Sequence, residues 1–158
     1  MEKNLPPNEL VEVIQRAQRC GKVVVFTNGC FDLLHPGHIH LLSSARKLGD
    51  ILVVAANSDT SIRRLKGLSR PIFCQRDRIS MLEALTSVDY VVVFNEDTPI
   101  PLLKILKPDI LVKGDQYSLE EVVGHDVVSS YGGRVERVKV VDGFSTTEIV
   151  RRLSASDS

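Results

Sequence analysis

The sequence predicts a doubly wound α/β protein, with a mainly parallel five-stranded sheet and helices on both faces. Two observations lead to this fold class. Short runs rich in β-branched residues, without polar alternation, recur along the chain and are typical of strands buried on both faces of a parallel sheet. Amphipathic stretches with helical spacing lie among these runs. Strands that alternate with helices fold into such a sheet through right-handed crossovers.

The expected elements follow one another along the whole chain. A first helix has an apolar face made of Leu10, Val13, Ile14 and Ala17. The expected strands are residues 23–26, 51–56, 90–94, 110–112 and 135–141. Further apolar faces predict three more helices: Ile39, Leu42, Ala45 and Leu48; Ile79, Leu82 and Leu85; and Ile149, Val150 and Leu153.

Length and composition restrict the kind of protein. The 158 residues suit one domain, in which we expect residues 1–20 to be a helical extension and residues 154–158 a flexible tail. Twenty basic and twenty acidic residues give a formal charge of zero, which argues against a general nucleic-acid-binding protein. We find no signal peptide and no apolar run of bilayer length, so we expect no membrane association. Three scattered cysteines without a CxxC pair fit a cytoplasmic location.

The loop after the first expected strand has the features of an anion site. Gly29 permits a sharp turn and a close backbone approach to a ligand. Pro36 suits the first turn of a helix, whose free N–H groups then point back toward the strand end. His35 and His38 are three residues apart and share one face of that turn. Their imidazoles can donate hydrogen bonds to a phosphate, and protonation near pH 7 would add positive charge.

Other chemistries are weaker at the same residues. A zinc site of His35, His38 and His40 is an alternative, although His40 faces away from the other two and no cysteine or carboxylate stands at ligand spacing. Cys30 as a nucleophile is another, but it precedes Phe31 in a tight turn where small-residue packing explains it. The spacing also differs from the P-loop and from the GxGxxG dinucleotide fingerprint. Phosphate chemistry is therefore the favoured interpretation.

Polar residues follow the second expected strand at the same edge of the sheet. Ser58 or Asp59 caps the next helix, or Asp59 accepts hydrogen bonds from substrate hydroxyls, and both interpretations stay open. Segment 63–78 then holds an excess of positive charge over its single acid, Asp77. The basic residues are Arg63, Arg64, Lys66, Arg70, Arg76 and Arg78. The segment is either a solvated basic face or a mobile flap that closes over polyphosphate.

Two later segments complete the candidate site. Lys113, Gly114 and Asp115 follow the fourth expected strand, where Gly114 lets a nucleoside approach the backbone and Asp115 can accept from ribose hydroxyls. Residues 145–147 precede the last helix and predict a helix cap. The same helix start, with its hydroxyl groups, also forms a second phosphate cradle.

These motifs resemble a known family over most of the chain, from about Gly21 to Leu153. The segment 28–38, with Gly29, Phe31, Asp32, His35, Gly37 and His38, resembles the GxFDxxHxGH signature of the Rossmann-like, cytidylyltransferase-like nucleotidyltransferases. Segments 57–67 and 143–147 are similar to the family's second block and C-terminal phosphate motif. Segments 96–99 and 108–114 resemble one branch, the adenylyltransferase module of ADP-heptose synthase. Gln116 departs from that branch, which usually has an acid nearby.

The resemblance implies an activity and a substrate. We expect a stand-alone module, because a partner kinase cannot fit in this length, that transfers AMP from ATP to D-glycero-β-D-manno-heptose 1-phosphate. The products are ADP-heptose, for lipopolysaccharide or a related glycan, and pyrophosphate. The alternatives are a cytidylyltransferase that uses CTP and an alcohol phosphate such as glycerol 3-phosphate, and a non-catalytic nucleotide-binding module. We expect Mg²⁺ to travel with ATP without a metal site in the protein, and a homodimer is implied by the resemblance.

The resemblance also assigns roles to residues. The expected catalytic residues are His35, His38 and Lys66. The expected nucleotide-binding residues are Asn28, Gly29, Cys30, Phe31, Gly37, Lys113, Gly114, Asp115, Ser145, Thr146 and Thr147. Asp32, Asp59, Arg63 and Arg78 are expected to meet the acceptor.

Overall fold

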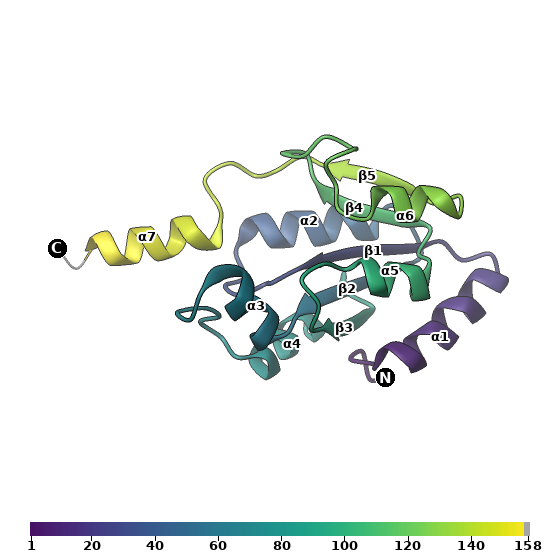
Figure 1. Ribbon diagram of the computed structural model, residues 1–158, viewed down its shortest axis with the longest axis horizontal. Helices are drawn as coiled ribbons and strands as arrows, with labels where there is room; N and C mark the ends of the chain where they lie inside the picture. Colours follow the sequence, from purple (N-terminus) through teal and green to yellow (C-terminus); the bar gives the residue numbers. More distant parts are fainter. Residues whose placement is uncertain (157–158) are drawn as a thin grey trace.

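Five parallel strands form one sheet in the order β3-β2-β1-β4-β5 in the computed structural model, which describes residues 1–156 (Figure 1). The strands are β1 (Val24–Gly29), β2 (Ile51–Asn57), β3 (Tyr90–Phe94), β4 (Ile110–Gly114) and β5 (Arg134–Val138). The central strand β1 pairs with β2 on one side and with β4 on the other. The predicted fold class is confirmed.

Seven helices accompany the sheet in the described residues. They are α1 (Pro7–Arg19), α2 (Pro36–Arg46), α3 (Asp59–Lys66), α4 (Gln75–Glu83), α5 (Ile100–Leu106), α6 (His125–Ser130) and α7 (Thr146–Ser156). Helices α1, α5 and α6 supply apolar side chains to one face of the sheet, and α2 and α4 supply them to the other. No helix in the described part of the chain is long and apolar enough to cross a bilayer.

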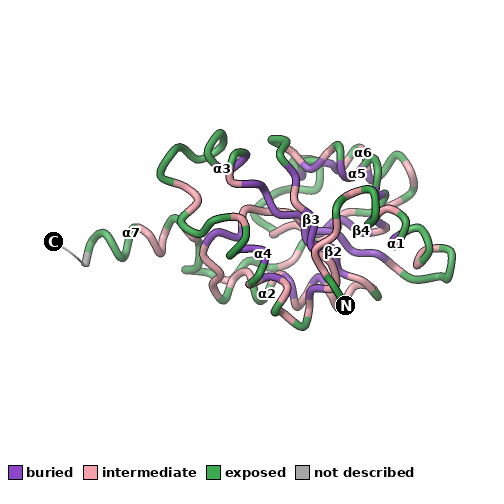
Figure 2. The backbone as a smooth tube through the Cα atoms, turned by 90° about the horizontal axis from the view of Figure 1, so that it is seen from below, coloured by how far each residue is buried: buried purple, intermediate pink, exposed green. Residues whose placement is uncertain are grey.

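Two hydrophobic cores lie on the two faces, and buried residues concentrate around the strands (Figure 2). Successive side chains of a strand point to opposite faces, so each strand contributes to both cores. In β1, Val24 and Phe26 pack with α1 and α5, whereas Val25 packs with α2. In β4, Leu111 belongs to the first core, and Ile110 and Val112 belong to the second. This alternation continues to the strand ends and decides where the polar residues there point.

The structure departs from the expected elements in four places. The last strand, expected at residues 135–141, is Arg134–Val138. The first strand runs to Gly29, so Asn28 is a strand residue. The short helices α5 and α6 were not expected. Helix α7 extends through Ser154 to Ser156, where we expected a flexible tail, and residues 157–158 of that expected tail lie outside the described residues. Helix α7 projects away from the sheet and its covering helices (Figure 1).

Candidate active site

Two cavities flank the carboxyl ends of β1 and β4, where the strand order reverses and α/β sheets usually bind ligands. The first, of about 280 Å³, is here called the histidine pocket. It is lined by His35, Gly37, His38, Leu41, Lys66, Gly114, Gln116, Val138, Lys139, Val140, Val141, Phe144, Ser145, Thr146 and Thr147. The second, of about 200 Å³, is here called the lysine pocket. It is lined by Asn28, Asp97, Thr98, Pro99, Lys113, Tyr117, Glu121, Val122 and Val123.

The first turn of α2 fixes both histidines of the histidine pocket. His35 is the N-cap residue, and its Nδ1 accepts a hydrogen bond from the Gly37 N–H at 3.1 Å. The Nδ1 of His38 accepts from the His35 N–H at 3.3 Å, which completes a capping box. Because each Nδ1 is an acceptor, the neutral rings carry their proton on Nε2. The two rings stack with centroids 3.8 Å apart, so both Nε2–H groups belong to one structural unit.

Both imidazoles are neutral at pH 7. Burial lowers the pKa of His38 to about 4, helped by the neighbouring His35 and Lys66, and a hydrogen bond with the Leu33 carbonyl only partly opposes this. Burial also lowers the pKa of His35. The expectation that protonation adds charge near pH 7 is therefore wrong for the free protein. The histidines offer neutral hydrogen-bond donors. Positive charge comes from Lys66 of α3, which lines the same pocket.

Aromatic rings and a glycine hold this histidine pair in place. Phe31 lies in a tilted contact with His38 at 5.4 Å, and Phe144 stacks on His35 at 6.2 Å. A Cβ atom on Gly37 would come within 2.8 Å of the His35 ring. Gly37 is therefore needed for the position of this ring. Phe144 was absent from our expected site residues, although it stands within the recognised motif 143–147.

The wall opposite the histidines comes from α7 and from the ends of β4 and β5. Ser145 caps α7, because its Oγ accepts from the Glu148 N–H at 3.0 Å. The residues 145–147 thus line the pocket at a helix start, as the sequence predicts. Gly114 lies beneath the Gln116 carboxamide, and any side chain at Gly114 would collide with it. Gln116 was not among the expected site residues. Its signal in the sequence was its departure from the family motif, which usually has an acid there.

Asp32 is not placed to bind the acceptor substrate. Its carboxylate is 2% exposed and accepts from the Ile72 and Phe73 N–H groups at 2.8 and 2.9 Å. It also pairs with Arg70 at 3.0 Å. The expected role of Asp32 in binding the acceptor is corrected, because its oxygens anchor the connection between α3 and α4.

Arg78 is a fully buried structural residue. Its guanidinium donates to the carbonyl oxygens of Cys30 at 2.7 Å and Asn57 at 2.8 Å, and it pairs with Asp59 at 2.9 Å. Burial alone would raise the pKa of Asp59, but hydrogen bonds from the Gln75 backbone and from Arg78 hold it below its usual value. The role expected for Arg78 in acceptor binding is corrected for this reason. Asp59 is held by Arg78 but stays partly exposed, so its role in acceptor binding remains a prediction.

Five further expected residues lie outside both cavities. Arg63 is exposed on α3. The carboxylate of Asp115 accepts from the Val140 N–H at 3.0 Å and so braces the turn after β4. Burial raises the pKa of the Cys30 thiol, which keeps it protonated and inert as a nucleophile. Gly29 and Phe31 shape the end of β1 without lining either cavity.

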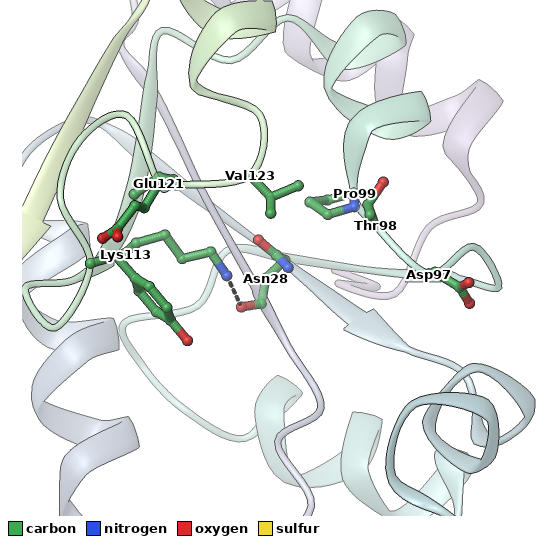
Figure 3. Close-up of a pocket in the computed structure, with 9 residues that line it drawn as sticks. Asn28, Asp97, Thr98, Pro99, Lys113, Glu121 and Val123 are labelled. Carbon is green, nitrogen blue, oxygen red and sulfur yellow. Dashed lines mark hydrogen bonds between the residues drawn. The ribbon is translucent and has the colours of Figure 1, made fainter.

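Asn28 and Lys113 point into the lysine pocket (Figure 3). The Lys113 Nζ donates to the Asn28 carbonyl at 3.0 Å, and burial lowers the pKa of this amine to about 8. The Asn28 Oδ1 is buried and has no hydrogen-bond partner. Both residues were expected beside Gly114 on the nucleotide, but the strand alternation separates them from it. Within residues 1–156 we find no group of three or more His, Cys, Asp or Glu side chains that could hold a metal.

Comparisons with known proteins agree with this arrangement. The sequence model of the family described as cytidylyltransferase-like matches residues 26–152. The bifunctional protein HldE of Syntrophotalea carbinolica is 59% identical over 144 residues, which are 91% of this chain and 29% of that protein. HldE of Geobacter sulfurreducens is 56% identical over 151 residues, which are 96% of this chain and 30% of that protein. The chain therefore spans about 30% of the length of these curated relatives.

A solved structure is also similar. The lipopolysaccharide core biosynthesis protein from Thermoplasma volcanium GSS1 matches with a TM-score of 0.62 and 32% identity. The match covers 77% of this chain and 98% of that one. The family match over most of the sequence, the likeness in structure and the histidine turn at the end of β1 together show that this chain belongs to the cytidylyltransferase-like family.

Proposed function

We propose that this chain transfers AMP from ATP to D-glycero-β-D-manno-heptose 1-phosphate, giving ADP-heptose and pyrophosphate. The observation that carries the reaction type is the histidine pocket, where two neutral imidazoles at a helix N-terminus share one cavity with Lys66 and the start of α7. None of its described lining residues is acidic, so it suits a polyanion. Because the chain spans about 30% of its HldE relatives, only this transfer is proposed for it.

The identity of the two substrates has separate support. Segments 96–99 and 108–114 resemble the adenylyltransferase module of ADP-heptose synthase, and the HldE relatives are 51–59% identical to this chain. Thr98 and Lys113, from these two segments, line the lysine pocket beside the ends of β1 and β4. ATP as donor also implies a cytoplasmic reaction.

The chemistry needs alignment and charge neutralisation. An oxygen of the sugar 1-phosphate attacks the α-phosphorus of ATP, the bond to the bridging oxygen breaks, and pyrophosphate leaves. The Nε2–H groups of His35 and His38 donate to oxygens of the α-phosphate and the bridge, for which His38 gives up its bond with the Leu33 carbonyl. Lys66 neutralises charge on the leaving group. The hydroxyl and N–H groups at 145–147 hold the β- and γ-phosphates. The nucleoside lies over Gly114, and the Gln116 carboxamide, which fills the place of a side chain there, moves aside or contacts it.

Magnesium is expected to arrive with ATP. Mg²⁺ in proteins prefers carboxylate, phosphate and water oxygens. The described lining of the histidine pocket provides no carboxylate, so the chain offers no protein ligand for the ion there. The ion would be held by phosphate oxygens and water.

The homodimer stays a proposal. Helix α7 projects from the sheet, and its apolar residue Leu153 is 63% exposed (Figure 1). An apolar helix face that is left exposed in one chain suits contact with a second copy. Light scattering of the purified protein tests this, because a dimer gives twice the mass of one 17.5 kDa chain.

Pyrophosphate release tests the proposed function. The donor is ATP or CTP, and each is combined with heptose 1-phosphate or glycerol 3-phosphate. We expect ATP with heptose 1-phosphate to give the highest kcat/KM of the four pairs. A higher kcat/KM for CTP with glycerol 3-phosphate would refute the heptose assignment, and no release with any pair would refute catalysis.

A further inference from the structure

The backbone of Phe31 lies in the left-handed region, a few residues before the histidine turn. Its φ is 49°, and Phe31 and Lys107 are the non-glycine residues with positive φ within residues 1–156. A bulky L residue rarely adopts this conformation, which persists only where surrounding contacts hold it. The loop that contains Phe31 is therefore held in place by contacts from outside itself.

The Phe31 ring supports the ring of His38. It is 3% exposed and contacts the His38 imidazole with the two centroids 5.4 Å apart. Gly29 leaves room for it, because a Cβ atom there would come within 3.2 Å of the Phe31 ring. In the free protein the His38 ring also accepts from the His35 N–H at 3.3 Å and bonds with the Leu33 carbonyl. The orientation of His38 therefore follows the loop after β1.

The carboxylate of Asp32 anchors this loop on one side of Phe31. Its oxygens accept from the N–H groups of Ile72 and Phe73 at 2.8 and 2.9 Å, and from the Arg70 guanidinium at 3.0 Å. The Asp32 side chain is 2% exposed and that of Arg70 is 13% exposed. Because a buried carboxylate that loses these donors is left unpaired, the anchor resists opening. The backbone of Asp32 is thus fixed relative to its partners on the connection between α3 and α4.

Arg78 anchors the loop on the other side of Phe31. Its fully buried guanidinium donates to the Cys30 carbonyl at 2.7 Å. Cys30 and Asp32, the two chain neighbours of Phe31, are therefore both bonded to segment 70–78. This double attachment explains how the unfavourable backbone conformation of Phe31 is maintained.

We propose that Asp32 is a positioning residue for the transfer of AMP: by joining the loop after β1 to residues 70–73 it fixes Phe31, and through Phe31 the ring of His38. The same anchor holds the chain that follows Lys66, which lines the histidine pocket. One carboxylate thus keeps a hydrogen-bond donor and the cation of the site in a fixed arrangement, and groups placed in advance stabilise a transition state best. The inference rests on the proposed function and gives Asp32 a task without contact to either substrate.

Asp32→Asn tests the anchor in turnover. Asparagine keeps the shape and one acceptor oxygen, but its NH₂ group meets the Arg70 guanidinium, donor against donor. We expect kcat to fall at least about tenfold and KM for ATP to stay within about threefold, because alignment is lost while contacts with the nucleotide remain. Arg70→Gln removes the same ion pair and should show the same pattern, so it replaces Asp32→Asn if that variant does not fold. An unchanged kcat, or a loss confined to KM, would overturn the inference.

The matched control is Asp89→Asn. Asp89 has the same two kinds of partner, because it accepts from the Leu52 N–H at 2.8 Å and pairs with Arg46 at 2.9 Å. It directly precedes β3, at the amino ends of the strands, and lines neither pocket. We expect kcat of this variant to stay within about twofold of the wild type. An equal fall of kcat in Asp89→Asn and Asp32→Asn would reveal a general effect of weakened folding and would overturn the inference.

A second substitution tests whether Asp32 acts through Phe31. Phe31→Leu removes the ring that contacts His38 and leaves the Asp32 carboxylate in place. Residues that act as one unit are not additive, so Asp32→Asn should lower kcat by less than about threefold more in the Phe31→Leu protein. Losses that multiply in full would show that Asp32 acts independently of Phe31, which contradicts the inference.

Nuclear magnetic resonance of the histidine rings needs neither substrate nor turnover. Burial, His35 and Lys66 lower the pKa of His38 to about 4, and the Leu33 carbonyl opposes them. In the wild type we therefore expect the same ring nitrogen shifts for His38 at pH 7.5 and at pH 6.0. In Asp32→Asn the released ring is better hydrated, so its pKa rises toward the ordinary 6.5 and the shifts change between the two pH values.

A spectrum of His38→Asn identifies the His38 signal among the four histidines of the chain. Shifts in Asp32→Asn that match the wild type at both pH values would overturn the inference. Because the measurement uses the free protein, its outcome separates failure of the positioning role from failure of the proposed reaction.

Discussion

At the scale of single residues, His35 and His38 each use their two ring nitrogens differently. In both residues Nδ1 closes the first turn of α2, which leaves the Nε2–H of His38 for the hydrogen bond with the Leu33 carbonyl and the Nε2–H of His35 for a ligand. The spacing of the two residues in the sequence is sufficient to place them on one face of a helix start. Their tautomer and their neutral state were not predictable, because both depend on burial and on backbone partners that only the folded turn provides.

Substitution of His35 by asparagine separates its two tasks. The Oδ1 of asparagine can replace Nδ1 as the cap acceptor, but asparagine has no group in place of Nε2–H. We expect His35→Asn to lower kcat about 100-fold while the unfolding free energy changes by less than about 0.5 kcal/mol. His35→Ala should lose a similar factor in kcat and also about 1 kcal/mol of stability, because the cap is gone. Urea unfolding and steady-state kinetics measure both. Wild-type kcat in His35→Asn would remove this residue from catalysis.

The lowered pKa of His38 predicts how stability depends on pH. The unfolded chain takes up a proton on this ring near pH 6.5, whereas the folded protein does so only near pH 4. Between these values the unfolded state binds more protons, so the unfolding free energy rises as pH increases from about 4 to 6.5. We expect His38 to contribute about 2 kcal/mol to this rise.

Urea unfolding at several pH values from 4.5 to 7.5 checks this contribution. The matched variant is His38→Asn, which keeps an acceptor for the His35 N–H and cannot titrate. Its unfolding free energy should rise less steeply between pH 4.5 and 6.5 than that of the wild type. Parallel curves for the two proteins would show that His38 titrates normally in the folded state.

At the scale of elements, the basic segment 63–78 divides into parts with different tasks. Lys66 lines the histidine pocket, Arg70 pairs with Asp32, and Arg78 is buried beneath the strand ends. The charge excess was visible in the sequence. The division of these basic residues between different tasks was not visible, because it depends on contacts with residues 19 to 48 positions away. The flap hypothesis is therefore restricted to residues 67–69, which are exposed and lie between α3 and the anchored part.

Hydrogen exchange with and without ATP tests this restricted flap. The Ile72 and Phe73 amides donate to the Asp32 carboxylate, so we expect them to be protected in both states. The amides of 67–69 should gain protection only when ATP is bound. In Asp32→Ala, the Ile72 and Phe73 amides should exchange rapidly, and the unfolding free energy should fall by about 3 kcal/mol. Equal exchange of 67–69 in both states would leave only a solvated basic face.

The same scale explains why Asn28 and Lys113 line a different cavity from Gly114. The β-branched runs of a parallel sheet lack polar alternation, so the sequence did not reveal which face each residue meets. Asn28 and Gly29 were therefore assigned to one site, as were Lys113 and Gly114. Helices α5 and α6 were missed because they have seven and six residues, too few for a helical period to stand out.

At the scale of the whole molecule, the strand order brings the loops after β1 and β4 together although they are far apart in the sequence. The fold class, the histidine turn and the phosphate cradle at 145–147 were predictable, because each depends on a local pattern. The presence of two cavities on opposite sides of the strand ends was not, since it follows from the packing of α2 against one face and of α5 and α6 against the other.

The central claim is that AMP passes in one step from ATP in the histidine pocket to heptose 1-phosphate. The stereochemistry at the α-phosphorus tests it most directly, with ATP made chiral there by sulfur and oxygen isotopes and heptose 1-phosphate as acceptor. A single in-line displacement inverts the configuration, so we expect ADP-heptose with inverted phosphorus. Retained configuration would require an intermediate with AMP attached to the protein, and would contradict direct transfer from ATP to the acceptor.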